Sequence, residues 1–240
     1  MLHNGHQALV VDPVDAHPVM DALKRLGVTL ELILVTHHNA DHTRCGVALR
    51  LHTGCKVFGP ALEPMPESLT RLPECEQVHA LGLTFNVLDV PGHTSGHIAY
   101  YCQQVNGAPL LLCGDTLFIA GCDRQLEETA AQMLQSLRSM SDLPEDTPVC
   151  CTDEYTLSNL DFAAAADPED SYLIDHTTSC RWLRAEFLST LPSNIRTEKL
   201  INPFLRARKS TLISATQTFA ATAKDDICVF AALRQWKNPF

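Results

Sequence analysis

The stretch Val-Thr-His-His-Asn-Ala-Asp-His-Thr-Arg-Cys occupies residues 35–45 and continues a short apolar run that begins at Leu32. The apolar run predicts a buried strand. In the six residues after Thr36, the chain places His37, His38, Asp41 and His42. A lone histidine at a strand end is usually a solvated turn residue, and a lone aspartate is usually a helix cap. Three histidines and an aspartate this close together favour a metal site instead.

Strands and helices alternate on both sides of this turn. Apolar runs predict strands over residues 8–11, 32–35 and 55–58, and helical spacing predicts helices over residues 16–26 and 41–53. Asp15 is the expected cap of the first helix, and Gly54 is the expected stop of the second. Val47, Ala48 and Leu51 are expected to face inward from that second helix. This order predicts a sheet with helices packed on it.

The middle of the chain has a different pattern. Residues 59–75 contain four prolines and predict a loop, whereas residues 83–90, 98–102 and 110–113 predict strands joined by short turns. Such turns favour antiparallel or mixed pairing. A helix over 129–140 and a strand over 148–151 follow, and after Tyr155 the pattern is helical (157–166, 171–188, 209–223 and 226–237). The predicted fold class is α/β, an αββα sandwich followed by a small helical domain.

Composition limits the possible partners. The chain has 240 residues, of which 45% are hydrophobic and 19% charged, as in an ordinary globular protein. A formal net charge of −10 argues against nucleic acid or an anionic membrane as a partner. The 10 cysteines are scattered without a Cys-x-x-Cys pair, and the sequence has no signal peptide or long apolar run. We therefore expect a reduced, cytoplasmic, monomeric protein.

Polar, metal-capable residues follow four of the predicted strands. They are the turn 37–42, the loop Pro-Gly-His-Thr-Ser-Gly-His at 91–97, the turn Gly-Asp-Thr at 114–116, and Thr-Asp-Glu-Tyr at 152–155. Each segment alone is a weak signal. Their repetition after successive strands predicts a common site, because ligands bind where the strand ends of a sheet converge.

With these segments in view, the chain resembles the metallo-β-lactamase superfamily and, within it, glyoxalase II, the hydroxyacylglutathione hydrolase. The likeness covers nearly the whole chain. It rests on the four segments above and on Val-Asp-Pro at 11–13, Ala-Gly-Cys at 120–122, Asn-Pro-Phe-Leu-Arg at 202–206 and Leu-Arg-Gln-Trp-Lys at 233–237. The last two belong to the helical region specific to glyoxalase II. The resemblance implies a metal-binding domain over residues 1–156 and a substrate-binding helical domain over residues 157–240.

The resemblance also implies a dinuclear centre of two divalent ions, zinc with iron or manganese as alternatives. It would split S-D-lactoylglutathione into D-lactate and glutathione through a metal-bound hydroxide. His37 and His93 are assigned to the first metal, Asp41 and His42 to the second, and Asp115 to the bridge. Asp41 and Asp115 are the implied catalytic carboxylates. His97 matches a family histidine that supports the site without binding metal.

Two departures from the family pattern fall on implied ligands. Asn39 stands where the family has the second histidine of H-x-H-x-D-H, and Asp153 stands where it has the histidine of G-H-E-Y-T. An amide oxygen is a weak zinc ligand, and an oxygen-richer site favours manganese or iron. His38 is an alternative replacement for Asn39, although adjacent residues after a strand point in different directions.

The resemblance assigns glutathione binding to Arg124, Tyr155, Arg234 and Lys237. Their clustering would create a local anion site in an acidic protein, whereas on sequence alone Arg234 and Lys237 read as helix C-terminal charges. Further departures are Val14, Asp123, Leu126 and Glu128, at positions where the family has Gly or, at 126, an aromatic residue. The family's first strand is also missing before Met1, and we expect either an exposed sheet edge there or a core that is short of one strand.

Three functions remain open from the sequence. The first is a glyoxalase II-like thioester hydrolase with an altered metal centre. The second is an impaired or inactive paralogue that keeps the fold and binds glutathione or a single metal. The third is a related acyl hydrolase that acts on another thioester or a lactone.

Overall fold

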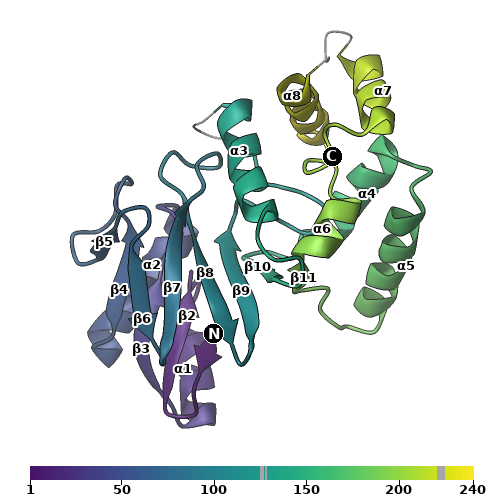
Figure 1. Ribbon diagram of the computed structural model, residues 1–240. Coiled ribbons are helices and arrows are strands. Elements are labelled where there is room, and N and C mark those ends of the chain that lie inside the picture. Colours follow the sequence, from purple (N-terminus) through teal and green to yellow (C-terminus); the bar gives the residue numbers. More distant parts are fainter. Residues whose placement is uncertain (125–126, 128, 221–224) are drawn as a thin grey trace. The chain divides into compact units, whose positions relative to one another are not determined.

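A computed structural model describes residues 1–124, 127, 129–220 and 225–240 (Figure 1). The strands are β1 (Leu2–His3), β2 (Gln7–Val11), β3 (Thr29–Leu34), β4 (Lys56–Pro60), β5 (Thr70–Leu72), β6 (Gln77–Ala80), β7 (Leu83–Asp89), β8 (Ile98–Val105), β9 (Ala108–Gly114), β10 (Pro148–Cys151) and β11 (Ser193–Asn194). The helices are α1 (Ala16–Leu26), α2 (Ala40–Thr53), α3 (Ala130–Ser141), α4 (Thr156–Ala166), α5 (Ser171–Ala185), α6 (Ile195–Ile201), α7 (Ser210–Phe219) and α8 (Asp226–Lys237).

The chain divides into two compact units. The first unit comprises Met1–Val90 and Thr94–Gly114, and the second comprises Pro91–His93 and Asp115–Phe240. The predicted mixed α/β class with a helical C-terminal region is confirmed. Among the described residues, no helix is both long and apolar enough to cross a membrane.

The first unit contains a sheet in the order β1-β2-β3-β4-β5. Strands β2 to β5 pair in parallel, as expected of β-α-β connections, and β1 pairs antiparallel with β2. Strands β6, β7, β8 and β9 form a second, antiparallel set in that order. The Tyr100 hydroxyl on β8 donates a hydrogen bond to the Val35 carbonyl (2.7 Å) and so ties the two sets together.

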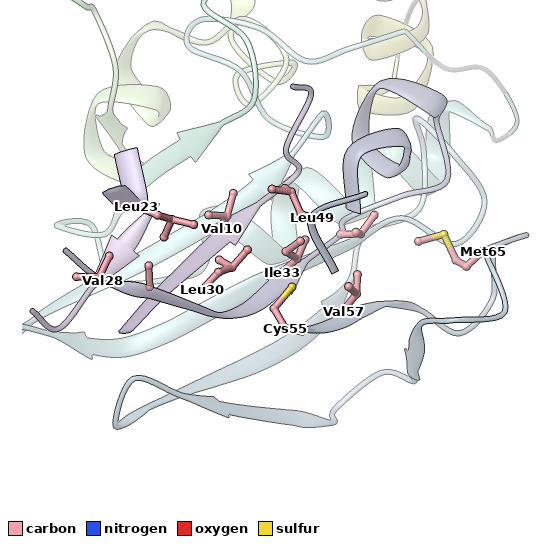
Figure 2. Close-up of a cluster of buried hydrophobic side chains, with 11 residues drawn as sticks. Val10, Leu23, Val28, Leu30, Ile33, Leu49, Cys55, Val57 and Met65 are labelled. Carbon is pink, nitrogen blue, oxygen red and sulfur yellow. The ribbon is translucent and has the colours of Figure 1, made fainter. Parts of the chain in front are cut away.

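Local signals place the two helices of this unit. Asp15 Oδ1 accepts a hydrogen bond from the His17 backbone N–H (2.8 Å) at the start of α1, and Gly54 ends α2 in the left-handed conformation (φ 74°). Leu23 of α1 and Leu49 of α2 pack on the parallel sheet in the core drawn in Figure 2. Both predicted helix ends are confirmed.

The prediction that Val47, Ala48 and Leu51 of α2 face inward is wrong. Leu51 is 82% exposed, and Val47 and Ala48 are also exposed, whereas His42, Gly46 and Leu49 are buried. His42 and Gly46, which are not apolar side chains, occupy the buried face of α2. The apolar residues of the helix therefore predict the opposite face as the buried one. The loop predicted over 59–75 also contains the short strand β5, which pairs with β4.

The second unit is mostly helical. Its strand β10 pairs antiparallel with β11, which lies in the region that the sequence predicted to be wholly helical. Its core gathers buried side chains from α4, α5 and α6 around Ile119 and Ala120. The helix predicted over 209–223 is present as α7, and residues 221–224 lie outside the described residues.

Candidate functional site

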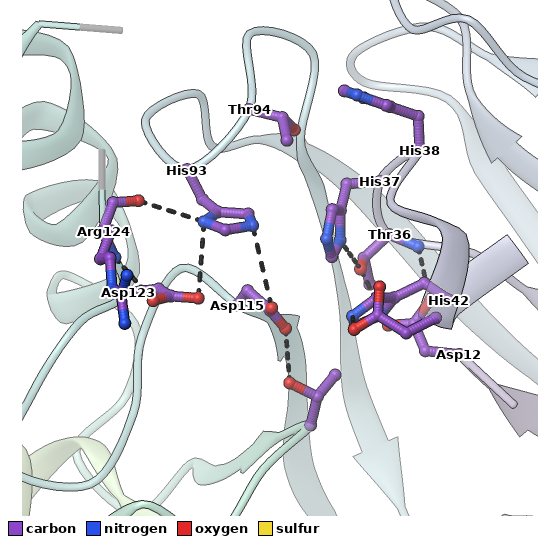
Figure 3. A network of polar contacts seen from close by, with 12 residues as sticks. Asp12, Thr36, His37, His38, His42, His93, Thr94, Asp115, Asp123 and Arg124 are labelled. Carbon is purple, nitrogen blue, oxygen red and sulfur yellow. Dashed lines mark hydrogen bonds and ion pairs between the residues drawn. The ribbon is translucent and has the colours of Figure 1, made fainter. Parts of the chain in front are cut away.

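The first group of site residues lies in the first unit, at the turn after β3. The Thr36 backbone N–H and hydroxyl both donate to the Asp12 carboxylate, at 2.9 and 2.8 Å. Nδ1 of the fully buried His37 lies 3.0 Å from the Thr36 hydroxyl oxygen (Figure 3). Because the Thr36 proton is directed at Asp12, this oxygen accepts from the His37 Nδ1–H. The arrangement assigns the lone pair of His37 to Nε2, the form that binds a metal.

His42, in the first turn of α2, is held by the same carboxylate. Its Nδ1 lies 3.4 Å from Asp12 Oδ2 and its Nε2 lies 3.6 Å from Asp41 Oδ2. The His42 and His37 rings are 4.0 Å apart, and the buried His97 ring stacks on His37 at 4.7 Å. Asp12 thus orients two histidines at once. Its φ of 45° is unusual for a residue other than glycine, as is common at functional sites.

Asn39 and Asp41 flank the start of α2. Asn39 is the N-cap residue, and its backbone carbonyl accepts from the His42 and Thr43 N–H groups at 3.0 and 3.2 Å. The Asp41 side chain is 64% exposed, a position that a negative charge favours in the first turn of a helix.

His38 points to a different partner. Its Nδ1 lies 3.0 Å from Oε2 of Glu63, a carboxylate in the proline-rich loop that is buried in the first unit. The other oxygen of Glu63 accepts from the Thr94 hydroxyl and from the Gly96 N–H (3.2 Å). Glu63 thereby braces both the His-rich turn and the 94–97 loop. No motif in the sequence indicated this role.

Glycine is required at the end of β9. Gly114 adopts φ 52°, and a Cβ there would lie 2.5 Å from the Thr36 hydroxyl oxygen and 2.6 Å from His97 Cε1. Only a residue without a side chain permits this close approach. The chain then delivers Asp115 directly after the strand.

The second group of site residues lies in the second unit and centres on His93. Its Nδ1 lies 3.1 Å from the Arg124 carbonyl and 3.5 Å from Asp123 Oδ2, and its Nε2 lies 3.9 Å from Asp115 Oδ2 (Figure 3). A carbonyl oxygen only accepts, so the His93 proton sits on Nδ1 and the lone pair on Nε2.

Asp115 is oriented by the turn after β10. The Thr152 hydroxyl donates to Asp115 Oδ1 (2.5 Å), and this leaves Oδ2 as the oxygen nearest His93. Asp153 is exposed beside Thr152. Glu154 accepts from the Thr190 N–H (2.9 Å) and hydroxyl (2.8 Å), which fixes the following residues of this turn and holds the pKa of Glu154 below its ordinary value.

These contacts fit a metal-binding role. His37 and His93 are buried, each directs its Nδ1 at an oxygen acceptor, and each therefore presents Nε2 as the donor atom. His42 is also buried, with Nδ1 3.4 Å from Asp12 Oδ2 and Nε2 3.6 Å from Asp41 Oδ2. Asp115 adds a carboxylate oxygen of the kind that zinc, iron and manganese accept.

A cavity of about 230 Å³ opens in the second unit. Its lining contains all four residues that the resemblance assigned to glutathione, namely Arg124, Tyr155, Arg234 and Lys237. The Arg234 side chain is 5% exposed, its guanidinium lies 5.1 Å from the Phe204 ring centre, and its Nη1 donates to the Cys122 carbonyl (2.6 Å). Its buried Nε has no hydrogen-bond partner among the described residues.

The electrostatics of this cavity favour an anion. Burial, reinforced by the nearby Arg234, lowers the pKa of Lys237 to about 8. Keeping the lysine in its charged ammonium form therefore costs free energy. The buried arginine and the partly desolvated lysine are both stabilised when a negative charge enters.

The remaining departures from the family pattern carry no backbone strain where the structure describes them. Among residues 1–124, the non-glycine residues with positive φ are Asp12, Cys75, Leu81, Asn106 and Ala120, so Val14 and Asp123 are accommodated without a left-handed backbone. Leu126 and Glu128 lie outside the described residues.

Family models match the chain along almost its whole length. The model of the metallo-β-lactamase superfamily matches residues 1–152, and the model of the hydroxyacylglutathione hydrolase C-terminus matches residues 154–240. A hydroxyacylglutathione hydrolase of Albidiferax ferrireducens is 58% identical over all of this chain and 94% of its own length. The hydrolase of the same name from Pseudomonas entomophila is 48% identical over 98% of this chain and 92% of its own length.

Solved structures show the same fold. ETHE1 from Myxococcus xanthus matches with a TM-score of 0.62 and 24% identity over 96% of this chain and 88% of its own. A metallo-β-lactamase from Staphylococcus aureus matches with a TM-score of 0.63 and 19% identity over 97% of this chain and 64% of its own. The chain belongs to the metallo-β-lactamase superfamily and, within it, to the hydroxyacylglutathione hydrolases, the glyoxalase II family.

Proposed function

We propose that this chain hydrolyses the thioester of S-D-lactoylglutathione to D-lactate and glutathione. The observation that carries the proposal is the orientation of two buried histidines, His37 and His93, each of which directs Nδ1 at an oxygen acceptor and presents Nε2. Family membership supplies the reaction class, because the curated relatives are hydroxyacylglutathione hydrolases.

The proposed metal ligands are those implied by the family pattern. His37, His93 and Asn39 would hold one divalent ion, Asp41, His42 and Asp153 the other, and Asp115 would bridge them. Zinc is the expected metal, with iron or manganese as alternatives. When bound, the ions supply an activated water and polarise the thioester carbonyl.

The chain's own groups prepare this chemistry. Asp12 fixes the tautomer of His37 through the Thr36 hydroxyl and lies beside His42. The Arg124 carbonyl fixes the tautomer of His93, and Thr152 orients Asp115. The leaving group is a thiolate, which departs without a strong general acid. Asp41 and Asp115 are the proposed catalytic carboxylates, since they would contact the ions and the reacting water.

The proposed substrate pocket is the cavity lined by Arg124, Tyr155, Arg234 and Lys237. The glycine carboxylate of glutathione is an anion of the size and charge that Arg234 and Lys237 are placed to receive. Binding it would offset the desolvation of Lys237.

The proposed function divides between two parts of the chain. Residues 1–156 form the proposed metal-binding part and residues 157–240 the proposed substrate-binding part, and the two family models support this division. A cytoplasmic, monomeric enzyme is part of the same proposal. Size-exclusion chromatography with light scattering tests the monomer.

One alternative has a specific observation in its favour. Asn39 and the exposed Asp153 replace two imidazoles of the family's ligand set, so a chain that keeps the fold and binds glutathione or one metal is the second candidate. A third, hydrolysis of another thioester or of a lactone, would use the same groups.

The deciding experiment combines elemental analysis of the purified protein with a lactoylglutathione hydrolysis assay. The proposal expects stoichiometric metal, and hydrolysis that is lost in Asp115→Ala. A protein that neither retains metal nor hydrolyses after loading with zinc, iron or manganese would establish the inactive alternative. The double variant Asn39→His/Asp153→His should raise both metal affinity and rate, and no rise in either would mean that the ligands are wrongly assigned.

The pocket has its own test. Lys237→Met should raise KM for lactoylglutathione while kcat is retained, because the lysine binds a part of the substrate remote from the thioester. Lys199→Met, on the exposed face of α6, is the matched control and should change neither constant. A Lys237→Met enzyme with unchanged KM would remove this lysine from the substrate site.

A further inference from the structure

His93 is flanked by two carboxylates in the second unit. Asp115 Oδ2 lies 3.9 Å from its Nε2, on the side proposed for metal, and Asp123 Oδ2 lies 3.5 Å from its Nδ1, on the opposite side of the ring (Figure 3). The glyoxalase II resemblance places glycine at position 123, so the ligand set that it implies includes no carboxylate there. Asp123 is therefore a feature of this chain that the family's ligand set does not explain.

The Asp123 carboxylate is held in place. Its Oδ1 accepts a hydrogen bond from the Arg124 backbone N–H at 2.7 Å, and its side chain is only 25% exposed. The main chain around it is held by Arg234, whose Nη1 donates to the Cys122 carbonyl (2.6 Å) and lies 3.4 Å from the Asp123 carbonyl. A fixed, partly desolvated carboxylate acts more strongly on its neighbours than one in free solvent.

We propose that Asp123 is a positioning residue for His93, a carboxylate placed behind the imidazole that strengthens metal binding at Nε2. The Nδ1–H donates to the Arg124 carbonyl, and the adjacent negative charge stabilises that orientation of the ring and attracts a dication on the far side. This inference rests on the proposed metal-binding function. Carboxylates behind ligating histidines typically contribute about 10- to 100-fold in metal affinity.

The position of Asp123 also fits the loss of an imidazole ligand at Asn39. His93 and Asn39 are assigned to the same metal, and Asn39 is the position where an imidazole has been replaced by a weak amide ligand. An added charge behind His93, one of the two imidazoles that remain for this metal, opposes that loss. Glycine at position 123, as in the family pattern, would leave the Arg124 carbonyl beside His93 Nδ1 and remove the adjacent charge.

The test is zinc affinity, measured by competition with a chromophoric chelator on the intact chain. Asp123→Asn removes the charge and keeps the shape, and Asp123→Gly restores the family residue. Both should weaken zinc binding by at least about tenfold. Asp161→Asn, an exposed aspartate paired with Arg181 on α5, is the matched control and should bind zinc as the parent chain does. Parent-like affinity in both Asp123 variants would overturn the proposal.

Two further readouts separate this inference from its alternatives. Nitrogen-15 NMR of the histidine ring should show more exchange between tautomers at His93 in Asp123→Gly, and an unchanged spectrum would exclude a positioning role. If instead Asp123 serves the substrate pocket, its variants would change KM at full metal loading and leave zinc affinity intact. A protein that shows the zinc effect but no thioester hydrolysis would retain this inference and reject the proposed reaction.

Discussion

At the scale of single residues, the site depends on side chains that are not themselves proposed ligands. Asp12 accepts two hydrogen bonds from Thr36 and lies beside His42, so one carboxylate orients both imidazoles of the His-rich turn. It is itself buried, so it is costly to leave unpartnered. The orientation of the ligands is therefore as sensitive to Asp12 as to the histidines.

Replacing Asp12 with alanine should lower metal affinity by roughly 10- to 100-fold, because the Thr36 hydroxyl that holds His37 Nδ1 loses its acceptor and His42 loses the carboxylate beside it. The Thr36 N–H also loses its acceptor, and this should lower the free energy of unfolding by about 1–3 kcal/mol. Chelator competition and urea denaturation measure the two effects. Asp15→Ala, which removes only the α1 cap, should reduce stability and leave metal affinity unchanged.

Glu198 predicts a pH dependence of stability. Burial raises the pKa of this carboxyl from 4.5 to about 7, despite hydrogen bonds from Ser193, Asn202 and the Ala120 N–H. A folded-state pKa above the unfolded value means that the folded chain binds the proton more tightly. The resulting stabilisation is complete below pH 4.5 and is lost as the pH rises to about 7.

The variant Glu198→Gln should remove this dependence, since its oxygen can accept from Ala120 and Asn202 while its amide donates to Ser193. Between pH 5 and 8 the parent chain should lose up to roughly 3 kcal/mol of unfolding free energy relative to the variant. Chemical denaturation across this range measures the difference. Glu67→Gln, on an exposed loop, is the control. Parallel curves for parent and Glu198→Gln would exclude a raised pKa.

At the scale of elements, the loop that carries His93 is fixed by α3. The helix begins with a capping box at Thr129 and Gln132, and its Ser136 hydroxyl donates to the Pro91 carbonyl (2.7 Å). Gly92 passes so close to the helix that a Cβ would lie 2.1 Å from the Met133 sulfur and 3.0 Å from the Met133 Cα.

Gly92→Ala should therefore be strongly destabilising, by roughly 2–4 kcal/mol, because the clash includes backbone and the φ of 153° disfavours a side chain. Thermal and urea unfolding measure this. Gly46→Ala is the control. Gly46 lies within α2, and a Cβ there would be 3.8 Å from Val57 Cγ1, an ordinary contact distance. Alanine at this helical position should therefore be neutral or stabilising by up to about 1 kcal/mol. Equal effects of the two substitutions would contradict the steric argument.

At the scale of the whole molecule, the proposed ligands come from segments far apart in the chain, from His37 to Asp153. Metal binding should therefore be coupled to global stability, because the unfolded chain cannot assemble the set. Free zinc at 100 times its dissociation constant should add about 2.7 kcal/mol to the unfolding free energy.

Calorimetry should show a higher unfolding midpoint with zinc than after chelation. Asp115→Ala should show little or no difference between the two conditions. If zinc, iron and manganese all leave the unfolding midpoint of the parent chain unchanged, the chain keeps the fold but does not bind metal.

Elements bounded by local signals were predictable from the sequence, and those defined by distant pairing were not. The limits of α1 follow from the Asp15 cap and Gly27, which adopts φ 67°. The short strands β1, β5 and β11 have two or three residues each and exist because a partner strand lies beside them. Too few residues carry a periodic pattern for the sequence to reveal them. The buried face of α2 was missed because His42 and Gly46 occupy it.

The sequence by itself determined the family, the candidate ligands and the four residues of the proposed glutathione pocket, because motif spacing and residue type are properties of the linear chain. Only the tertiary structure decided which ring nitrogen His37 and His93 present, that Asp12 and Glu63 brace the His-rich turn, that Arg234 is buried, and that Asp123 lies behind His93. These facts depend on hydrogen bonds between residues far apart in the sequence. Such contacts arise from packing, which no local pattern specifies.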